Sequence, residues 1–362
     1  MHTVEYISDT RNDLMYSVRR HRICERGILT VCVALLVFVL VPAMSWGGET
    51  LERIRSKGVL RCGVSESLMG FSMKDKNGRW SGFEADFCRA AAAAVLGSPE
   101  KVAFVPLSAP ARFPALISGD VDLLLCDTTW TLEREALLDV AFAGTLYYDG
   151  QAFMVPVKSK ARRVSELNGA TICVVKGTTH VEGLSDYFGQ HGLRYTPLLL
   201  EHSSEVEDAF YGGRCLAYTA DKSGLAAVRI ESPGGAKQFV ILPDVISKEP
   251  LGPVVKRGDE EWLMIVKWVV FTLIEAEELG ITRDNVLTAK KAATGSDVWR
   301  FLDGSTRFGK ALGTSPDWTV QVIESVGNYG EMFERNLGAL ELDRGLNRLW
   351  TEGGLMYAPP FR

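Results

Sequence analysis

Three groups of polar residues each come directly after an apolar run that predicts a buried strand. In chain order they contribute Asp127, Thr129, Arg134, Thr178, Thr179 and Asp221. A guanidinium binds a carboxylate through two hydrogen bonds, free amides at a helix start favour the same anion, and a carboxylate neutralises an ammonium. Together these groups would hold a zwitterion, with one set of partners for each pole.

Each of these residues also has an ordinary structural explanation. Arg134 would serve in a surface ion pair, and the threonines and Asp221 are common helix caps. In open α/β sheets, however, ligands bind beyond the carboxyl ends of the strands, and all three groups lie at such ends. We therefore favour the binding interpretation for the set as a whole.

An alternation of strand and helix patterns from residue 50 to residue 155 positions the first group. The expected strands are 59–64, 102–106 and 121–125, the expected helices are 83–95 and 112–117, and a hairpin turns at Asn77 and Gly78. The run at 121–125 is so uniformly apolar that both of its faces must be covered. This pattern predicts an α/β lobe with a mixed, mostly parallel sheet flanked by helices.

A second alternation positions the other two groups. The extended segment 151–157 leads to expected strands at 171–175, 195–200 and 216–219 and to helices at 179–188, 205–211 and 222–229. The chain then returns near Pro250, so we expect lobe 1 at 48–152 plus 250–362 and lobe 2 at 153–249. Lobe 1 would carry a helical C-terminal extension that includes an amphipathic helix at 259–279. The two crossings between lobes would form a hinge.

The first 47 residues resemble an export leader. Basic residues up to Arg26 precede an uncharged apolar stretch at 27–48 that ends in small residues, which is the order of a secretory signal peptide. The stretch also approaches the length of a membrane span, so an uncleaved anchor is the alternative. We expect export to the periplasm, with cleavage between Ser45 and Glu49.

The cysteines fit an oxidising compartment. Beyond the leader they are Cys62, Cys88, Cys126, Cys173 and Cys215, an odd number without the CxxC spacing of a metal site. Cys62 would end a strand and Cys88 lies in the next helix, while Cys173 and Cys215 begin two strands of lobe 2, so both pairings are sterically feasible. Buried free thiols are the alternative, and Cys126 is left over in either case.

The composition favours a small solute as partner. A formal net charge of −5, with 23% charged residues, offers no basic field for phosphates, so we expect no nucleic-acid partner. The chain has no GxSxG, HExxH or phosphate-loop motif. We therefore expect no cofactor, no metal and no catalytic residue, in a protein that acts as a monomer.

The polar groups also carry a family resemblance. The runs 119–122, 128–134 and 177–179, which read GDVD, TTWTLER and GTT, resemble the family 3 solute-binding proteins of polar amino-acid ABC transporters. Within that family the chain is most similar to the general L-amino-acid-binding periplasmic branch, over nearly the whole length beyond the leader. The resemblance implies a type II periplasmic-binding-protein fold, a free L-amino acid as ligand and the permease subunits of an ABC transporter as membrane partner.

The resemblance further implies roles for single residues. Arg134, Thr129 and the amide of Thr179 would bind the α-carboxylate of the ligand. Asp221, the Thr129 hydroxyl and the Asp127 carbonyl would bind its α-ammonium. The side-chain pocket would be formed by Leu68, Phe71, Trp80, Cys126, Val175 and Thr178. For the two aromatics, packing within the lobe is an equal alternative.

The pocket departs from the resembling branch at three positions. That branch tends to carry Arg and Asn where this chain has Cys126 and Asp127, and a polar residue where this chain has Val175. The loss of a cation and the gain of a carboxylate should disfavour Asp and Glu as ligands, because a further carboxylate would be repelled and costly to desolvate. We favour a neutral ligand; the alternative is that Asp127 pairs with arginine, lysine or ornithine.

Two other functions fit the same fold. Periplasmic cyclohexadienyl or arogenate dehydratases resemble these binding proteins, and Glu66 or Asp127 would then be the acid, but neither belongs to a recognisable dyad. An amino-acid sensor would close in the same way and signal to a receptor, a function that an uncleaved leader would favour. We favour transport over both.

Overall fold

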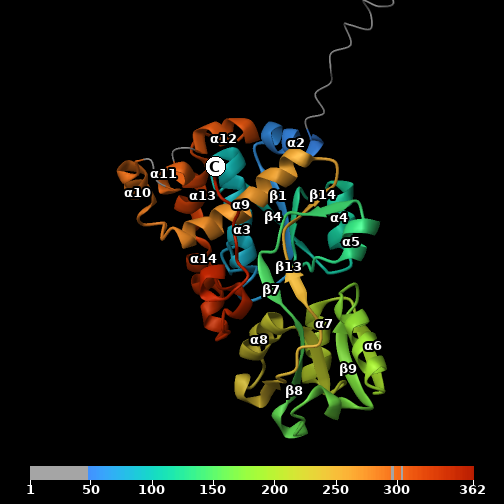
Figure 1. The fold of residues 1–362 in the computed structure, drawn as a ribbon. Coiled ribbons are helices and arrows are strands. Elements are labelled where there is room, and N and C mark those ends of the chain that lie inside the picture. The colour runs from blue at the N-terminus through green and yellow to red at the C-terminus, as the bar shows by residue number, and fades with distance from the viewer. Residues whose placement is uncertain (1–47, 295–296, 303–304) are drawn as a thin grey trace, which may run out of the picture. The chain divides into compact units, whose positions relative to one another are not determined.

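The computed structural model describes residues 48–294, 297–302 and 305–362, and the expected leader at 1–47 lies outside them. Two five-stranded sheets organise the described chain (Figure 1). The first has the strand order β4-β1-β5-β14-β6. In it β1 (Leu60–Ser65) pairs parallel with β4 (Val102–Leu107) and β5 (Leu123–Leu125), whereas β14 (Val254–Lys256) pairs antiparallel with β5 and β6 (Val140–Phe142). The sheet of lobe 1 is therefore mixed, and β14 brings the chain back to it from lobe 2.

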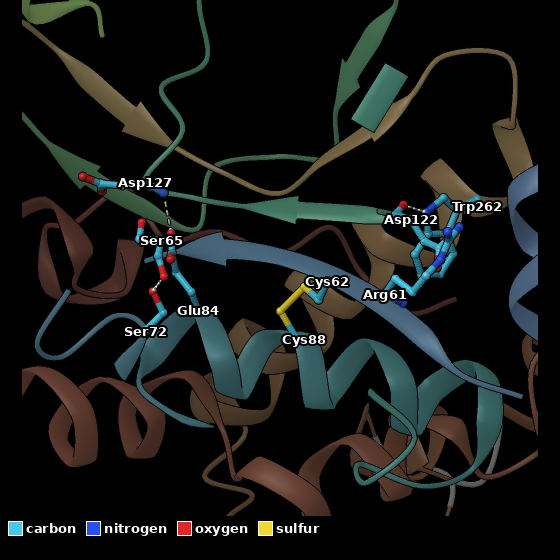
Figure 2. Close-up of a disulfide and its surroundings, with 9 residues drawn as sticks. All are labelled: Arg61, Cys62, Ser65, Ser72, Glu84, Cys88, Asp122, Asp127 and Trp262. Carbon is cyan, nitrogen blue, oxygen red and sulfur yellow. Dashed lines mark hydrogen bonds and ion pairs between the residues drawn. A yellow bond between two sulfur atoms is a disulfide. The ribbon is translucent and has the colours of Figure 1, made fainter. Parts of the chain in front are cut away.

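The alanine-rich helix α3 (Phe83–Leu96) is buried along most of its length, because its small side chains allow close approach to the elements around it. Cys88 of α3 and Cys62 of β1 lie at a disulfide distance of 2.10 Å between sulfur atoms, which ties the helix to the sheet (Figure 2). Lobe 1 also contains α2 (Glu49–Lys57), α4 (Arg112–Ser118) and α5 (Leu132–Leu137). The expected hairpin is present as β2 (Met73–Lys74) and β3 (Trp80–Ser81), which pair antiparallel.

Asp122, from the run that resembles family 3, has a structural role. Its buried carboxylate accepts hydrogen bonds from the side chains of Arg53 and Arg61. Its carbonyl accepts one from the Trp262 indole at 2.8 Å (Figure 2 shows Arg61, Asp122 and Trp262). These contacts fasten the start of β5 to helices α2 and α9. Asp122 therefore holds the sheet in place and contributes nothing to the cavity described below.

The second sheet has the order β10-β9-β11-β8-β12. Strands β10 (Tyr195–Leu200), β9 (Ala170–Val175) and β11 (Ala217–Asp221) are parallel. Strand β8 (Gln151–Pro156) runs antiparallel to β11, and β12 (Phe239–Ile241) runs antiparallel to β8. The helices of lobe 2 are α6 (His180–Gln190), α7 (Ser203–Tyr211) and α8 (Lys222–Glu231). Cys173 of β9 and Cys215, just before β11, lie at a disulfide distance of 1.95 Å between sulfur atoms.

The two connections between the sheets pair with each other. Strand β7 (Tyr147–Asp149) and strand β13 (Glu249–Leu251) form an antiparallel ladder in which Asp149 lies opposite Glu249. The chain enters lobe 2 directly after β7 and leaves it directly before β13. The crossing segments are thus the short extended strands β7 and β13. The first crossing lies before the expected segment 151–157, most of which forms β8 within the sheet of lobe 2.

The remainder of the chain is helical, as expected. Helix α9 (Glu260–Glu278) begins at Asp259, whose carboxylate accepts a hydrogen bond from the Trp262 amide, and it buries a broad apolar face against α3 and α13. The other helices are α10 (Val286–Ala292), α11 (Asp297–Leu302), α12 (Ser305–Leu312), α13 (Trp318–Val326) and α14 (Tyr329–Leu337). Short 3₁₀ turns occur at Val157–Ser159, Val164–Leu167, Ala236–Gln238, Gly338–Leu340, Gly345–Asn347 and Trp350–Glu352. Within the described ranges, no helix is both long enough and apolar enough to cross a membrane.

Candidate functional site

A cavity of about 110 Å³ lies between the two lobes. It is formed at the carboxyl ends of β1, β4 and β5 in lobe 1 and of β9, β10 and β11 in lobe 2. The residues expected from the sequence that line it are Leu68, Cys126, Asp127, Thr129, Val175, Thr178, Thr179 and Asp221. The structure therefore brings together groups that lie far apart in the chain, whereas Arg134, Phe71 and Trp80 are not among the lining residues.

Asp221 occupies a helix-cap position without acting as a cap. It ends β11 and precedes α8, but its side chain makes no capping hydrogen bond; the carboxylate of Asp149 accepts one from the Ser223 amide at 3.1 Å instead. Asp221 is 2% exposed, and its Oδ2 lies 3.3 Å from Nε2 of His180. Its Oδ1 is buried without a hydrogen-bond partner among the described residues. This oxygen is free to accept a bond from a group that enters the cavity.

Asp127 is held in an unusual backbone conformation. Its φ is +46°, a left-handed value that Asp tolerates better than most residues. Its amide donates to Oε1 of Glu84 at 2.6 Å, and its carbonyl accepts from Nη1 of Arg112 at 3.1 Å (Figure 2 shows the bond to Glu84). Its Oδ1 is also buried without a partner among the described residues. Hydrogen bonds thus fix both the amide and the carbonyl of Asp127, and the carboxylate faces the cavity.

Acidic groups are in excess at this end of the cavity. Burial, followed by the charge of Asp221, raises the pKa of Asp127 well above its usual range. Burial and the charges of Asp149 and Glu249 do the same for the pKa of Asp221. Burial lowers the pKa of His180, so this imidazole is neutral at neutral pH and does not balance the carboxylates. An ammonium group placed here would supply the missing positive charge.

His180, Asp221 and Glu249 also resemble a metal-binding trio, since one ligand atom of each lies within 4.8 Å of the others. Both oxygens of Glu249, however, already accept hydrogen bonds, one from the Thr179 hydroxyl at 2.8 Å and one from the Ser247 hydroxyl. Glu249 is thus already used to hold the two hydroxyls in place. The chemistry of the trio fits an organic cation that donates one or two charge-assisted hydrogen bonds to the carboxylates better than it fits a metal ion.

Arg112 supplies a cation that the sequence analysis overlooked. It is 3% exposed, and its guanidinium donates to the carbonyls of Cys126 at 2.8 Å and Gly177 at 3.3 Å, so that it spans the two lobes. Its Nε lacks a partner among the described residues, and the side chain lines the cavity. Arg112 opens α4 directly after β4. The signal was present in the sequence, because Arg112 follows the expected strand 102–106 and ligands bind beyond the carboxyl ends of such strands.

Arg134 lies close to the cavity without lining it. Its Nη1 donates to the carbonyl of the lining residue Thr129 at 2.7 Å, and its guanidinium stands 5.3 Å from the ring centre of Phe113. Burial, and then the nearby charge of Arg112, lower the pKa of Arg134 to about 10. Two guanidinium groups therefore lie close together, and their hydrogen bonds go to neutral backbone carbonyls, an arrangement that attracts an anion.

Threonine hydroxyls from the two lobes meet at the cavity. Oγ1 of Thr129 and Oγ1 of Thr179 are 3.4 Å apart. Thr179 precedes the first residue of α6, so the free amides of that helix start lie beside it. The Thr178 hydroxyl donates to the Val175 carbonyl at 2.7 Å, which closes the turn after β9. These contacts hold the start of α6 against lobe 1.

Cys126 is a thiol in the floor of the cavity. Its Sγ lies 3.6 Å from the Ser65 hydroxyl and 3.4 Å from the Leu107 carbonyl. Burial raises the pKa of Cys126 to about 12, so the group stays protonated and unreactive. Leu68 and Val175 add apolar wall.

The two aromatics expected in the pocket pack inside lobe 1 instead. Phe71 is 1% exposed and makes edge contacts with the rings of Phe83 and Tyr147. The Trp80 ring lies against Phe104. The Phe71 ring lies in the core because it packs against these two aromatic rings. Burial there removes more apolar surface from water than exposure to a polar cleft would.

The comparisons with known proteins agree with this geometry. A model of the family described as bacterial extracellular solute-binding proteins, family 3, matches residues 60–284. The general L-amino acid-binding periplasmic protein AapJ of Rhizobium johnstonii is 46% identical over 327 residues, which are 89% of this chain and 95% of the relative. The glutamate/glutamine/aspartate/asparagine-binding protein BztA of Rhodobacter capsulatus is 46% identical over 333 residues, covering 91% of this chain and 97% of the relative.

A solved structure shows the same fold. The ABC transporter periplasmic binding protein from Brucella ovis with glutathione bound is 45% identical and superposes with a TM-score of 0.84, covering 87% of this chain and all of that one. The chain therefore belongs to the bacterial extracellular solute-binding proteins, family 3.

Proposed function

We propose that this protein is the periplasmic substrate-binding component of an amino-acid ABC transporter and holds a free L-amino acid between its lobes. One observation carries the proposal: acidic and basic side chains that line the cavity each have one buried atom without a hydrogen-bond partner among the described residues. Oδ1 of Asp221 and Oδ1 of Asp127 are unpaired acceptors, and Nε of Arg112 is an unpaired donor. A zwitterion satisfies both kinds at once.

The α-ammonium would lie against Asp221 and Asp127. The α-carboxylate would accept from Arg112, the Thr129 hydroxyl and the free amides at the start of α6, with Arg134 as a second nearby cation. This assignment places the Asp127 side chain at the ammonium end instead of in the side-chain pocket. Asp127 and Asp221 line the same cavity, and the charge of Asp221 adds to the effect of burial in raising the pKa of Asp127.

The ligand would act as the latch between the lobes. Arg112, Asp127 and Thr129 come from lobe 1, and Thr179 and Asp221 come from lobe 2, so a bound amino acid bridges both. We infer that the lobes of the free protein rotate about the paired strands β7 and β13 and that ligand binding shifts the population toward the closed form.

The relatives define which ligands to test. AapJ is named for general L-amino acids, BztA for four acidic and amide amino acids, and the Brucella protein contains glutathione. Glutathione carries a free α-amino acid group on its glutamyl end, so the same pair of poles would recognise it. We infer no catalytic activity, since both named relatives are binding proteins.

The test uses protein exported with its own N-terminal segment and freed of bound solute by unfolding and refolding. Thermal unfolding would be followed with the common L-amino acids, selected D-isomers, glutathione and prephenate, and hits would be measured by calorimetry. A solute that binds only the folded form raises the melting temperature. Stabilisation by L-amino acids without turnover supports the proposal; binding of glutathione alone, or consumption of prephenate, replaces it with a peptide-binding or an enzymatic function.

A further inference from the structure

The cavity continues past the zwitterion-binding end into lobe 2, beside helices α7 and α8. Glu207 of α7 and Glu231 at the end of α8 line this part. Tyr218 of β11 lines the cavity three residues before Asp221 of the same strand, and burial and the charge of Glu207 raise its pKa. A ligand that is anchored at Asp221 can therefore extend its side chain toward Glu207.

Two other acids of the same lining are already balanced by cations. Glu66 is 3.1 Å from Nδ1 of His202, and Glu201 is 3.4 Å from Nζ of Lys176. The side chains of Glu207 and Glu231, in contrast, form no hydrogen bond or ion pair within the described ranges. The charges that act on Glu207 are those of Glu231 and Asp208, both negative. Among the described residues, no cation is paired with these two acids in this part of the cavity.

The wall between the two ends is apolar. Leu68 and Met69 contribute from lobe 1, and Ala227 and Val228 contribute from α8. Arginine, lysine and ornithine have an apolar stem that suits such a wall and a charged head that seeks an acidic partner. The independent sign that a ligand fills this cavity is the pair of buried, unpartnered atoms at its other end, Asp221 Oδ1 and Arg112 Nε.

Resting on the proposed amino-acid-binding function, we propose that Glu207 and Glu231 select ligands with a cationic side chain. Glu207, and not Asp127, would then bind the charged end of a basic side chain. The Asp127 carboxylate would bind the α-ammonium. Glu207 and Glu231 also disfavour glutathione and glutamate, because their additional carboxylate would enter an already acidic compartment.

The test compares L-arginine with L-citrulline, its neutral analogue of nearly the same shape, and L-lysine with L-norleucine. Dissociation constants would be measured by calorimetry at pH 8 and low ionic strength, so that Glu207, with a pKa raised by burial to about 7, is ionised. We expect arginine to bind at least about tenfold more tightly than citrulline. The variants Glu207→Gln and Glu231→Gln should each reduce this ratio toward one.

Asp186→Asn is the matched control. It removes one negative charge from α6 of the same lobe, but Asp186 is exposed and does not line the cavity, so the ratio should stay near that of the unchanged protein. Two glutamate variants are used because either one alone could fold poorly, and each tests the same point.

The outcomes separate this inference from the function on which it rests. Equal affinities for arginine and citrulline, or a ratio that both glutamate variants leave intact, overturn the selectivity and leave amino-acid binding in place. Failure of every amino acid to bind, charged or neutral, overturns the proposed function as well. Tighter binding of glutathione than of any amino acid also overturns the selectivity.

Discussion

Asp127 and Asp221 are buried carboxylates whose surroundings oppose ionisation. Burial is the largest cause of the raised pKa of both, and the charge of Asp221 adds to the pKa of Asp127. A ligand ammonium would relieve this repulsion, so these residues are placed for binding at the expense of the stability of the free protein. Removal of either carboxylate should therefore weaken ligand binding and stabilise the ligand-free fold.

Replacement Asp221→Asn should weaken L-amino-acid binding by about 2–5 kcal/mol while making the ligand-free protein more stable at neutral pH. A carboxyl whose pKa is raised in the fold costs stability as the pH rises from the unfolded-chain value of about 3.9 toward the folded value, and Asn removes that cost. Calorimetry tests the affinity, and urea unfolding at pH 5 and pH 8 tests the stability. A variant with full affinity would remove Asp221 from the site.

The two arginines should respond differently to replacement by Gln. Arg112 donates to backbone carbonyls of Cys126, Asp127 and Gly177, so Arg112→Gln should lower both affinity and stability. Arg134 makes one such bond, so Arg134→Gln should lower affinity by about 2–5 kcal/mol and change stability less. Urea unfolding and calorimetry on both variants make the comparison. Full affinity in Arg134→Gln would leave Arg112 as the guanidinium that holds the carboxylate.

At the scale of elements, strand ends and helix starts deliver the polar groups, and the disulfides hold the elements in register. Cys62 links β1 to α3, and Cys173 and Cys215 link two neighbouring strands of lobe 2. None of the four lines the cavity, whereas the free Cys126 does. Replacement of the paired cysteines should therefore affect stability, and replacement of Cys126 should affect the binding site.

Removing the lobe 2 pair with Cys173→Ala and Cys215→Ala should lower the free energy of unfolding by about 3–4 kcal/mol, because the bond closes a loop of 42 residues. Ligand affinity of the protein that remains folded should change little. Urea midpoints without reductant provide the measurement, and Cys126→Ser, which keeps both pairs, is the control. Equal midpoints for the double variant and the unchanged protein would mean that the pair does not constrain the unfolded chain.

At the scale of the whole molecule, three contacts join the two lobes directly. Arg112 reaches Gly177, the hydroxyls of Thr129 and Thr179 approach each other, and Glu66 of lobe 1 meets His202 of lobe 2. The last pair is exposed and therefore contributes little on its own. It nevertheless makes closure depend on pH.

The Glu66 hydrogen bond and charge raise the pKa of His202, with smaller contributions from Glu205 and Glu201. Protonated His202 favours closure, so its contribution is present below the free histidine value of about 6.5 and is lost as the pH rises through the raised value. The ligand-free protein should therefore open slightly between pH 6 and pH 8, as measured by small-angle X-ray scattering. In His202→Gln this step should disappear; an identical step in the variant would assign it to other groups.

Most elements of the fold could be predicted from the sequence because their patterns are local. The apolar run at 121–125, the Ala-rich stretch that forms α3 and the capped start of α9 each carry a complete signal within a few residues. Strands β6 and β7 were missed because each has three residues and depends on a pairing partner from a distant part of the chain. Helix α5 was missed because its six residues are too few for a helical pattern to show.

The sequence by itself determined the family and the two alternations of strand and helix, and it predicted the main polar residues of the cleft, because strand ends mark where ligands bind. It left the cysteine pairing open, and the structure brings the two feasible pairs to disulfide distance. Only the tertiary structure decided which of the predicted site residues face the cavity. It placed Phe71 in the core, added Arg112, His180, Glu207 and Glu249 to the site, and transferred the helix-capping role from Asp221 to Asp149. Orientation and burial depend on contacts between residues that are distant in the chain, and these determine which charges remain unpaired.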